Sequence, residues 1–207
     1  MSVVVVDIGI GNTHSVVRAL VHVGAQPVLT ADPDAVRTAS HVVFPGVGAF
    51  GDCAAAARQL GMTDAITDYA KSGRPLIGLC VGMQLLFQSS TEFGLHEGMG
   101  LMAGSLDKIP TQNSDGTLLR VPHVGWSTVT PTSRSPLFSE LPDAFSAYFV
   151  HSYAVLEKDA PDCCAVTRYG DNAIVAAAQK DMLFGVQFHP EKSGPAGLKI
   201  LENFIRL

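Results

Sequence analysis

A single cysteine in the stretch GLCVGMQLLF, residues 78–87, is the first residue whose setting suggests chemistry. Cys80 follows the apolar run PLIGL and precedes a second apolar run, so the thiol is expected at a sharp strand-to-helix turn. Gly78 and Gly82 flank it at two residues' distance, where small residues leave room for the turn and for a substrate. A thiol at a helix start lies near free backbone N–H groups and the positive end of the helix dipole, which favour the reactive thiolate. The N–H of Val81 is then a candidate donor to an oxyanion.

The stretch LFGVQFHPEKSG, residues 183–194, offers the base that a cysteine nucleophile needs. The proline after His189 favours an extended conformation at that histidine, and in an extended chain residues two apart face the same side. His189 and Glu191 are therefore expected to project together, as an imidazole and the carboxylate that orients it. His123 and His151 have no carboxylate two or three residues away, so His189 is preferred as the base.

The loop FPGVGAF, residues 44–50, follows another apolar run and consists mainly of small residues. Such loops can present backbone N–H groups to an anion. The N–H of Val47 or Gly48 is therefore a candidate for a second oxyanion donor, opposite that of Val81.

Composition and charge limit the class of protein. A chain of 207 residues is expected to form one α/β domain over residues 1–207. The net charge of −5 and the absence of a Lys/Arg-rich run argue against nucleic-acid binding and membrane binding. The four cysteines form no CxxC pair and the histidines form no HxxxH or HExxH motif. We therefore expect a reduced, cytoplasmic protein without a metal or cofactor, in which the cysteines other than Cys80 are structural.

Alternating strands and helices must position these residues. In the first half, the expected strands are residues 3–6, 28–29, 42–44 and 75–79, and the expected helical regions are residues 12–23, 54–71 with an interruption near Gly61, and 82–88. Asn12 is expected to cap the first of these helices. The second half contains mainly short β-type runs, at residues 118–121, 127–130, 147–150, 165–167, 174–178 and 183–187, before a last helix at 195–205. The pattern predicts an α/β fold with a central, mostly parallel sheet flanked by helices and a β-rich second half.

Together these motifs resemble those of the class I glutamine amidotransferases, and more narrowly the glutaminase subunits of imidazole glycerol phosphate synthases. The resemblance rests on GMQLLF, PGVGAF, VPHVGW, YFVHSY and GVQFHPEKSGPAGLKILENF, which occur in this order between residues 4 and 204. It implies a flavodoxin-like core and hydrolysis of the side-chain amide of glutamine through a cysteine thioester. It also implies a heterodimer with a (βα)8-barrel cyclase subunit, which uses the ammonia in histidine biosynthesis.

Carried over residue by residue, the resemblance implies a role for each motif. Cys80 would be the nucleophile, His189 the general acid/base and Glu191 its orienter. The oxyanion hole would consist of Val81, Val47 and Gly48. The glutamine pocket would include Gln84, Glu92, His151, Ser152 and Tyr153. The partner interface would include Trp126, Tyr148, Lys192 and Asn12. The chain departs from the family pattern at Ile8 and Ser127, both near the expected interface.

Two other classes of protein remain open on the sequence. One is a different glutaminase subunit or a free-standing γ-glutamyl hydrolase, against which Met83 and the KSG after Glu191 argue. The other is a catalytically silent interaction domain, against which the complete Cys80, His189 and Glu191 set argues.

Overall fold

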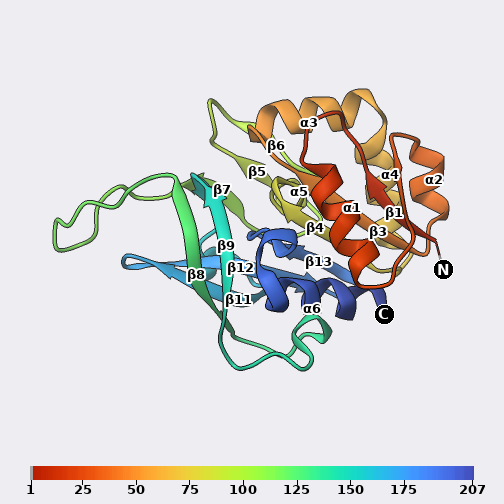
Figure 1. Cartoon of the computed structure of the whole chain (residues 1–207). Helices are drawn as coiled ribbons and strands as arrows, with labels where there is room; N and C mark the ends of the chain where they lie inside the picture. Colours follow the sequence, from red (N-terminus) through yellow and green to blue (C-terminus); the bar gives the residue numbers. More distant parts are fainter. Residues whose placement is uncertain (1) are drawn as a thin grey trace.

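A mixed β-sheet forms the centre of the protein (Figure 1), whose computed structural model describes residues 2–207. Within those residues the large sheet has nine strands in the order β2-β1-β3-β4-β13-β12-β11-β8-β9. The parallel half comprises β2 (Pro27–Thr30), β1 (Val3–Val6), β3 (His41–Gly46), β4 (Leu76–Cys80) and β13 (Leu183–Val186). The antiparallel half comprises β12 (Asn172–Lys180), β11 (Cys163–Tyr169), β8 (His123–Pro131) and β9 (Phe145–His151). The predicted fold class is confirmed, and the β-rich second half extends the parallel sheet by antiparallel strands.

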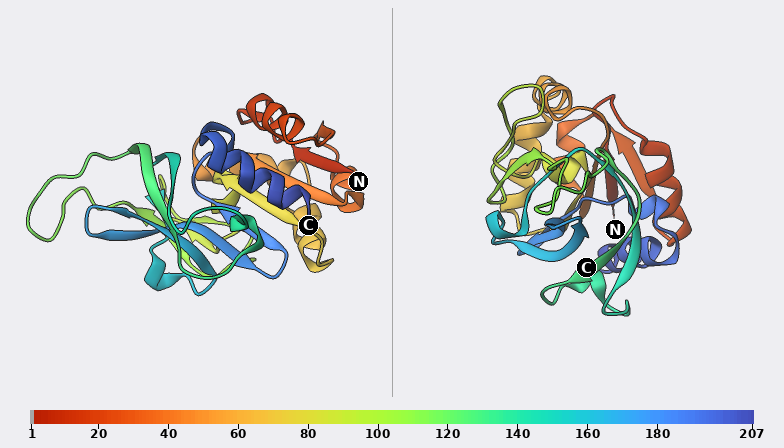
Figure 2. Two further views of the ribbon diagram at one scale, coloured as in Figure 1. Left: turned by 60° about the horizontal axis from the view of Figure 1, so that its bottom comes forward. Right: turned by 90° about the vertical axis from the view of Figure 1, so that its left-hand side faces the viewer.

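Helices cover both faces of the parallel half, which explains why its strands are apolar throughout. Alternation along β1 places Val3 and Val5 in one core and Val4 and Val6 in the other. The first core is covered by α1 (Thr13–His22) and α6 (Gly194–Ile205), which lie together on one face (Figure 2, left). The second core is covered by α2 (Pro33–Thr38), α3 (Phe50–Gln59) and α4 (Met62–Lys71).

A smaller sheet lies beside the carboxyl end of β4 and was not predicted. Its strands are β10 (Tyr153–Ala154), β7 (Ser105–Lys108), β5 (Ser89–Ser90) and β6 (His96–Glu97), in that order. Three short 3₁₀ helices complete the described chain: η1 (Pro136–Phe138), η2 (Glu157–Asp159) and η3 (Pro190–Lys192). Two of these elements matter for the site, because β10 follows β9 after one residue and η3 follows β13 after three.

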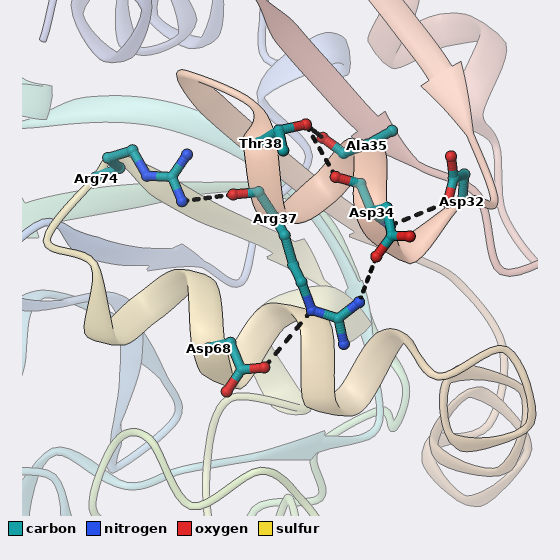
Figure 3. Close-up of polar contacts among 7 residues, drawn as sticks. All are labelled: Asp32, Asp34, Ala35, Arg37, Thr38, Asp68 and Arg74. Carbon is teal, nitrogen blue, oxygen red and sulfur yellow. Dashed lines mark hydrogen bonds and ion pairs between the residues drawn. The ribbon is translucent and has the colours of Figure 1, made fainter.

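The helix α2 was also missed, although its start carries a recognisable signal. The carboxylate of Asp32 accepts a hydrogen bond from the backbone N–H of Asp34 at 2.9 Å, and Pro33 occupies the first helical position. Arg37 then lies between Asp34 at 2.9 Å and Asp68 of α4 at 3.6 Å (Figure 3). These exposed ion pairs contribute little to stability, so the burial of Val36 in the second core, with α2 packed mainly on α4, holds the helix in place.

Three expectations about local structure were wrong. The helix predicted at residues 82–88 is only α5 (Val81–Gln84), because the buried chain turns at 85–88 and enters β5. The strand predicted at 118–121 reduces to one bridge between Leu118 and Gln112 in a projecting loop (Figure 1, green). Asn12 occupies the N-cap position of α1 but makes no capping hydrogen bond, because its side-chain oxygen accepts from the Ser15 hydroxyl at 3.1 Å.

Across residues 2–207, no helix is long and apolar enough to cross a membrane.

Candidate active site

Cys80 lies at the junction of β4 and α5, in the sharp turn that the sequence predicted. Its backbone has a φ of 53° and a ψ of −113°, which is unusual for a residue with a side chain. A Cβ atom on Gly82 would lie 1.8 Å from the carbonyl oxygen of Phe44, and one on Gly78 would lie 2.6 Å from the backbone nitrogen of Met83. Backbone packing therefore requires both glycines, Gly78 against the turn itself and Gly82 against the neighbouring strand β3. Strand pairing places Gly46 of β3 opposite Cys80, so the loop after β3 begins beside the thiol.

His189 and Glu191 form a buried pair behind the thiol. Nδ1 of His189 lies 2.8 Å from Oε1 of Glu191, and the two side chains are 4% and 2% exposed. Among residues 2–207, Nε2 of His189 has no hydrogen-bond partner, and the ring lines the same cavity as Cys80. Burial lowers the pKa of His189, but the neighbouring Cys80 and Glu191 outweigh it and raise the pKa to about 9. The imidazole is therefore oriented by a carboxylate and can hold a proton facing the thiol.

Backbone contacts fix His189 against the antiparallel half of the sheet. Its N–H donates to the carbonyl of Tyr148 in β9 at 2.9 Å. Its carbonyl accepts from the hydroxyl of Ser193 at 2.6 Å, and that hydroxyl in turn accepts from the N–H of Tyr148 at 3.0 Å. Two of these contacts join the segment 189–193 to β9 and the third closes the segment on itself, which explains how the histidine keeps its place outside a regular element.

A cavity of about 160 Å³ opens in front of the thiol. It is much smaller than the roughly 300–1,000 Å³ of pockets for drug-sized ligands, so it suits a substrate of amino-acid size. The lining residues are Val47, Gly48, Cys80, Val81, Gln84, Glu92, Val150, His151, Ser152, Tyr153 and His189. The structure therefore brings together every residue predicted for the oxyanion hole and the glutamine pocket, while Glu191 lies behind His189.

The loop after β3 contacts two neighbouring elements. Gly48 has a φ of +105°, in the region that favours glycine. The carboxylate of Glu92 accepts from the N–H of Phe50 at 2.7 Å, and the thiol of Cys53 donates to the carbonyl of Val47 at 3.4 Å. Glu92 thus binds the loop as well as lining the cavity, and it belongs to the segment after β5 instead of to a helix.

Gln187 is a site residue that the sequence analysis missed. Its amide group donates toward Sγ of Cys80 at 3.7 Å and its carbonyl oxygen accepts from Gln84 at 3.0 Å. The signal was present, because Gln187 lies two residues before His189 and residues two apart in an extended chain face the same side. Within residues 2–207, no group of three or more His, Cys, Asp or Glu side chains is arranged to hold a metal ion.

The residues predicted at the partner interface lie on β8, β9, η3 and the start of α1. Trp126 is 58% exposed, and its ring lies 6.1 Å from that of Tyr148 in the neighbouring strand. A Cβ on Gly194 would lie 3.9 Å from the Trp126 ring, so the tryptophan lies beside the segment that follows η3, and η3 carries the exposed Lys192. Asn12 is exposed at the start of α1 and bonds Ser15, which lines a second cavity with Glu191.

Known proteins match this chain over nearly its whole length. The family model described as glutamine amidotransferase class-I matches residues 4–207. "Imidazole glycerol phosphate synthase subunit HisH" of Sulfurimonas denitrificans is 44% identical, with 99% of this chain and 97% of the relative aligned. "Imidazole glycerol phosphate synthase subunit HisH 1" of Legionella pneumophila (strain Lens) is 38% identical, with 100% and 99% aligned.

Solved structures share the fold at lower identity. A chain of PurLQS from Thermotoga maritima has a TM-score of 0.74 and 21% identity, with 99% of this chain and 97% of that chain covered. Because the family model and the HisH relatives both span nearly the whole sequence, this chain belongs to the class I glutamine amidotransferase family, among the HisH subunits of imidazole glycerol phosphate synthase.

Proposed function

We propose that this chain hydrolyses glutamine to glutamate and ammonia at Cys80, as the glutaminase subunit of an imidazole glycerol phosphate synthase. The observation that carries the proposal is the small cavity bounded by Cys80 and His189, with the Glu191 carboxylate 2.8 Å from the far ring nitrogen. The family and the names of the full-length relatives support the same substrate and pathway.

The first half of the reaction makes a thioester. The Cys80 thiol gives its proton to Nε2 of His189, and the sulfur attacks the side-chain carbonyl carbon of glutamine. Backbone N–H groups of Val81 and of the Val47–Gly48 loop stabilise the oxyanion. The imidazolium then protonates the departing nitrogen, the C–N bond breaks, and ammonia leaves a γ-glutamyl thioester on Cys80. The raised pKa of His189 favours the protonated ring that this step requires.

The second half hydrolyses that thioester with the same residues. Water loses a proton to Nε2 of His189 and attacks the thioester carbonyl. The C–S bond breaks, glutamate leaves, and the proton on His189 returns to the sulfur. Glu191 accepts from Nδ1 of His189 throughout and fixes the orientation of the ring.

The ammonia needs a second subunit that can use it. Free ammonia released into water would be protonated and lose its nucleophilicity, so a shielded transfer to an acceptor site is required. We propose that the acceptor is a (βα)8-barrel cyclase subunit that makes imidazole glycerol phosphate and an aminoimidazole carboxamide ribotide. The face that would receive it comprises the exposed residues Val124, Trp126, Val150 and Lys192, with Tyr148 beside them. Val150 supports this choice, because it lines the cavity and is also 39% exposed on this face.

Binding of nucleotide substrate to the cyclase is proposed to switch the glutaminase on. The Val47–Gly48 loop would rearrange so that its N–H groups complete the oxyanion hole. The contacts from Cys53 and Glu92 give this loop a defined resting arrangement from which to move.

Glutamate release tests the function and the gating together. The chain would be assayed alone, with the barrel cyclase subunit, and with that subunit plus its nucleotide ligand. Activity that appears in the liganded complex and disappears in Cys80→Ala is expected. Turnover by the isolated chain equal to that of the liganded complex would contradict the gating, and turnover by Cys80→Ala would contradict the proposed chemistry.

A further inference from the structure

A chain of three side chains connects β8 to the wall of the active-site cavity. The Ser127 hydroxyl lies 2.7 Å from Nε2 of His123. Nδ1 of His123 lies 3.0 Å from Nε2 of His151, and Nδ1 of His151 lies 3.0 Å from the carbonyl oxygen of Tyr153. His123 and His151 are 2% and 6% exposed, so water does not compete freely for these contacts.

The direction of every hydrogen bond in this chain follows from its last member. The Tyr153 carbonyl can only accept, so Nδ1 of His151 must carry a hydrogen. In a neutral ring Nε2 of His151 is then bare, so Nδ1 of His123 must donate to it. Nε2 of His123 is bare in turn and accepts from the Ser127 hydroxyl. Both histidines are thereby fixed as the Nδ1–H tautomer.

The opposite direction would require a charged ring. If His151 carried two protons, it would donate to His123, which would donate to Ser127. Burial is the main cause that lowers the pKa of both His123 and His151, to about 4 in each case. At neutral pH both rings are therefore uncharged, and each hydrogen bond of the series is donated in the direction of Tyr153.

The fold provides a specific support for this chain. Four residues of regular strand span about 13 Å, more than a histidine and a serine side chain can bridge between them. Gly125, midway between His123 and Ser127, has a φ of +134° and bends β8 so that the two side chains meet. The His123 ring is stacked between Phe149 at 4.9 Å and Tyr169 at 4.2 Å.

We propose that Ser127 and His123 are positioning residues that hold His151 and Tyr153 in place for glutamine binding, which rests on the proposed glutaminase function. Both ring nitrogens of His151 are occupied within the protein, so its side chain shapes the cavity instead of bonding the substrate. The Tyr153 carbonyl also accepts from Gln84 at 3.3 Å, which joins the chain to Gln187 and the Cys80 sulfur. Ser127 lies next to Trp126 in β8, so the same strand carries the docking face on one side and this chain on the other.

The first measurement reads the tautomers without any substrate. Long-range ¹H–¹⁵N correlation spectra of the full chain, labelled in histidine nitrogens, are recorded at neutral pH. His123 and His151 are both expected to show a protonated Nδ1 and a bare Nε2. In Ser127→Ala the His123 Nε2 resonance is expected to move downfield, toward that of a nitrogen without a hydrogen-bond donor, and Ser127→Thr is expected to restore it. A His151 ring protonated at Nε2 in the wild type would overturn the proposal.

The second measurement separates positioning from catalysis. Glutaminase kinetics are measured for the complex with the cyclase subunit and its ligand. Loss of one buried hydrogen bond predicts that Ser127→Ala raises KM for glutamine about three- to tenfold while kcat changes less than about twofold. Ser127→Thr keeps the hydroxyl and is expected to restore KM. Ser133→Ala makes the same chemical change at an exposed position and is expected to leave KM unchanged.

The two measurements fail separately. A KM in Ser127→Ala equal to that in Ser133→Ala would overturn the positioning role, as would a fall in kcat at constant KM. A wild-type complex that does not turn over glutamine would overturn the proposed function. In that case the spectra, which need no glutamine, still decide whether the hydrogen-bonded chain has the direction inferred for it.

Discussion

Replacing Glu191 by glutamine should make the protonated form of His189 less stable without changing the shape of the site. In the native protein Oε1 of Glu191 lies 2.8 Å from Nδ1 of His189. Glutamine keeps a side-chain oxygen that can accept from Nδ1 but removes the negative charge. Raising the pKa of His189 from its ordinary 6.5 to about 9, against the opposing effect of burial, corresponds to about 3 kcal/mol in favour of the imidazolium. Cys80 and Glu191 share this effect, so we assign about 1–2 kcal/mol to the carboxylate.

The expected result of Glu191→Gln has two parts. The pKa of His189 should fall by about one unit, measured by NMR titration of its ring in Cys80→Ala and Cys80→Ala/Glu191→Gln. With Cys80 intact, kcat for glutamine should fall roughly five- to thirtyfold, because the imidazolium that protonates the leaving ammonia is less stable. Glu202→Gln, at an exposed ion pair of α6, is the control and should change neither quantity. A pKa that stays in place while kcat falls would refute the electrostatic role and leave Glu191 with a purely steric one.

Three further predictions follow from the same contacts. Gly82→Ala should destabilise the fold by about 3 kcal/mol or more, because the new Cβ would meet the Phe44 carbonyl oxygen at 1.8 Å, whereas the Cβ of Gly11→Ala would make an ordinary contact with the Thr13 methyl group at 3.5 Å; urea denaturation compares the two variants. Iodoacetamide near neutral pH should modify Cys80 first, since burial raises the pKa of Cys53, Cys163 and Cys164 to about 11, 11 and 12. Peptide mass spectrometry should find the Cys80→Ala variant almost unlabelled, and labelling of Cys53 before Cys80 in the wild type would contradict this. The free energy of unfolding should fall as the pH is lowered from about 6.5 to 4, because folding lowers the pKa of His123 and His151 and the unfolded chain binds the extra protons. In a His123→Phe variant, which keeps the aromatic stack, this fall should be shallower, and a pH profile identical to that of the wild type would contradict the prediction.

The chemistry of the site could be predicted from the sequence because it depends on local patterns. A cysteine between two glycines at the end of an apolar run already specifies the turn at Cys80. His189 itself is extended, as the proline after it predicts, and its ring meets the Glu191 carboxylate at 2.8 Å, although Glu191 lies in the 3₁₀ helix η3 and not in an extended segment. In both cases backbone geometry within a few residues decides the outcome.

Contacts between distant segments could not be predicted in the same way. The chain from Ser127 through His123 to His151 depends on a bend at Gly125 and on the pairing of β8 with β9. The helix expected at residues 82–88 ends early because Leu85, Leu86 and Phe87 are buried where the chain turns toward the small sheet. The two-residue strands of that sheet are too short to have a periodic signal of their own.

The most direct test of the central claim is to trap the covalent intermediate. The complex of this chain with the cyclase subunit and its nucleotide ligand would be mixed with glutamine, quenched in acid within the first turnover, digested and analysed by mass spectrometry. A γ-glutamyl thioester on the peptide that contains Cys80, lost when hydroxylamine is added and absent in Cys80→Ser, is the predicted result. Release of glutamate with no adduct on Cys80, or with an adduct on another residue, would contradict the account.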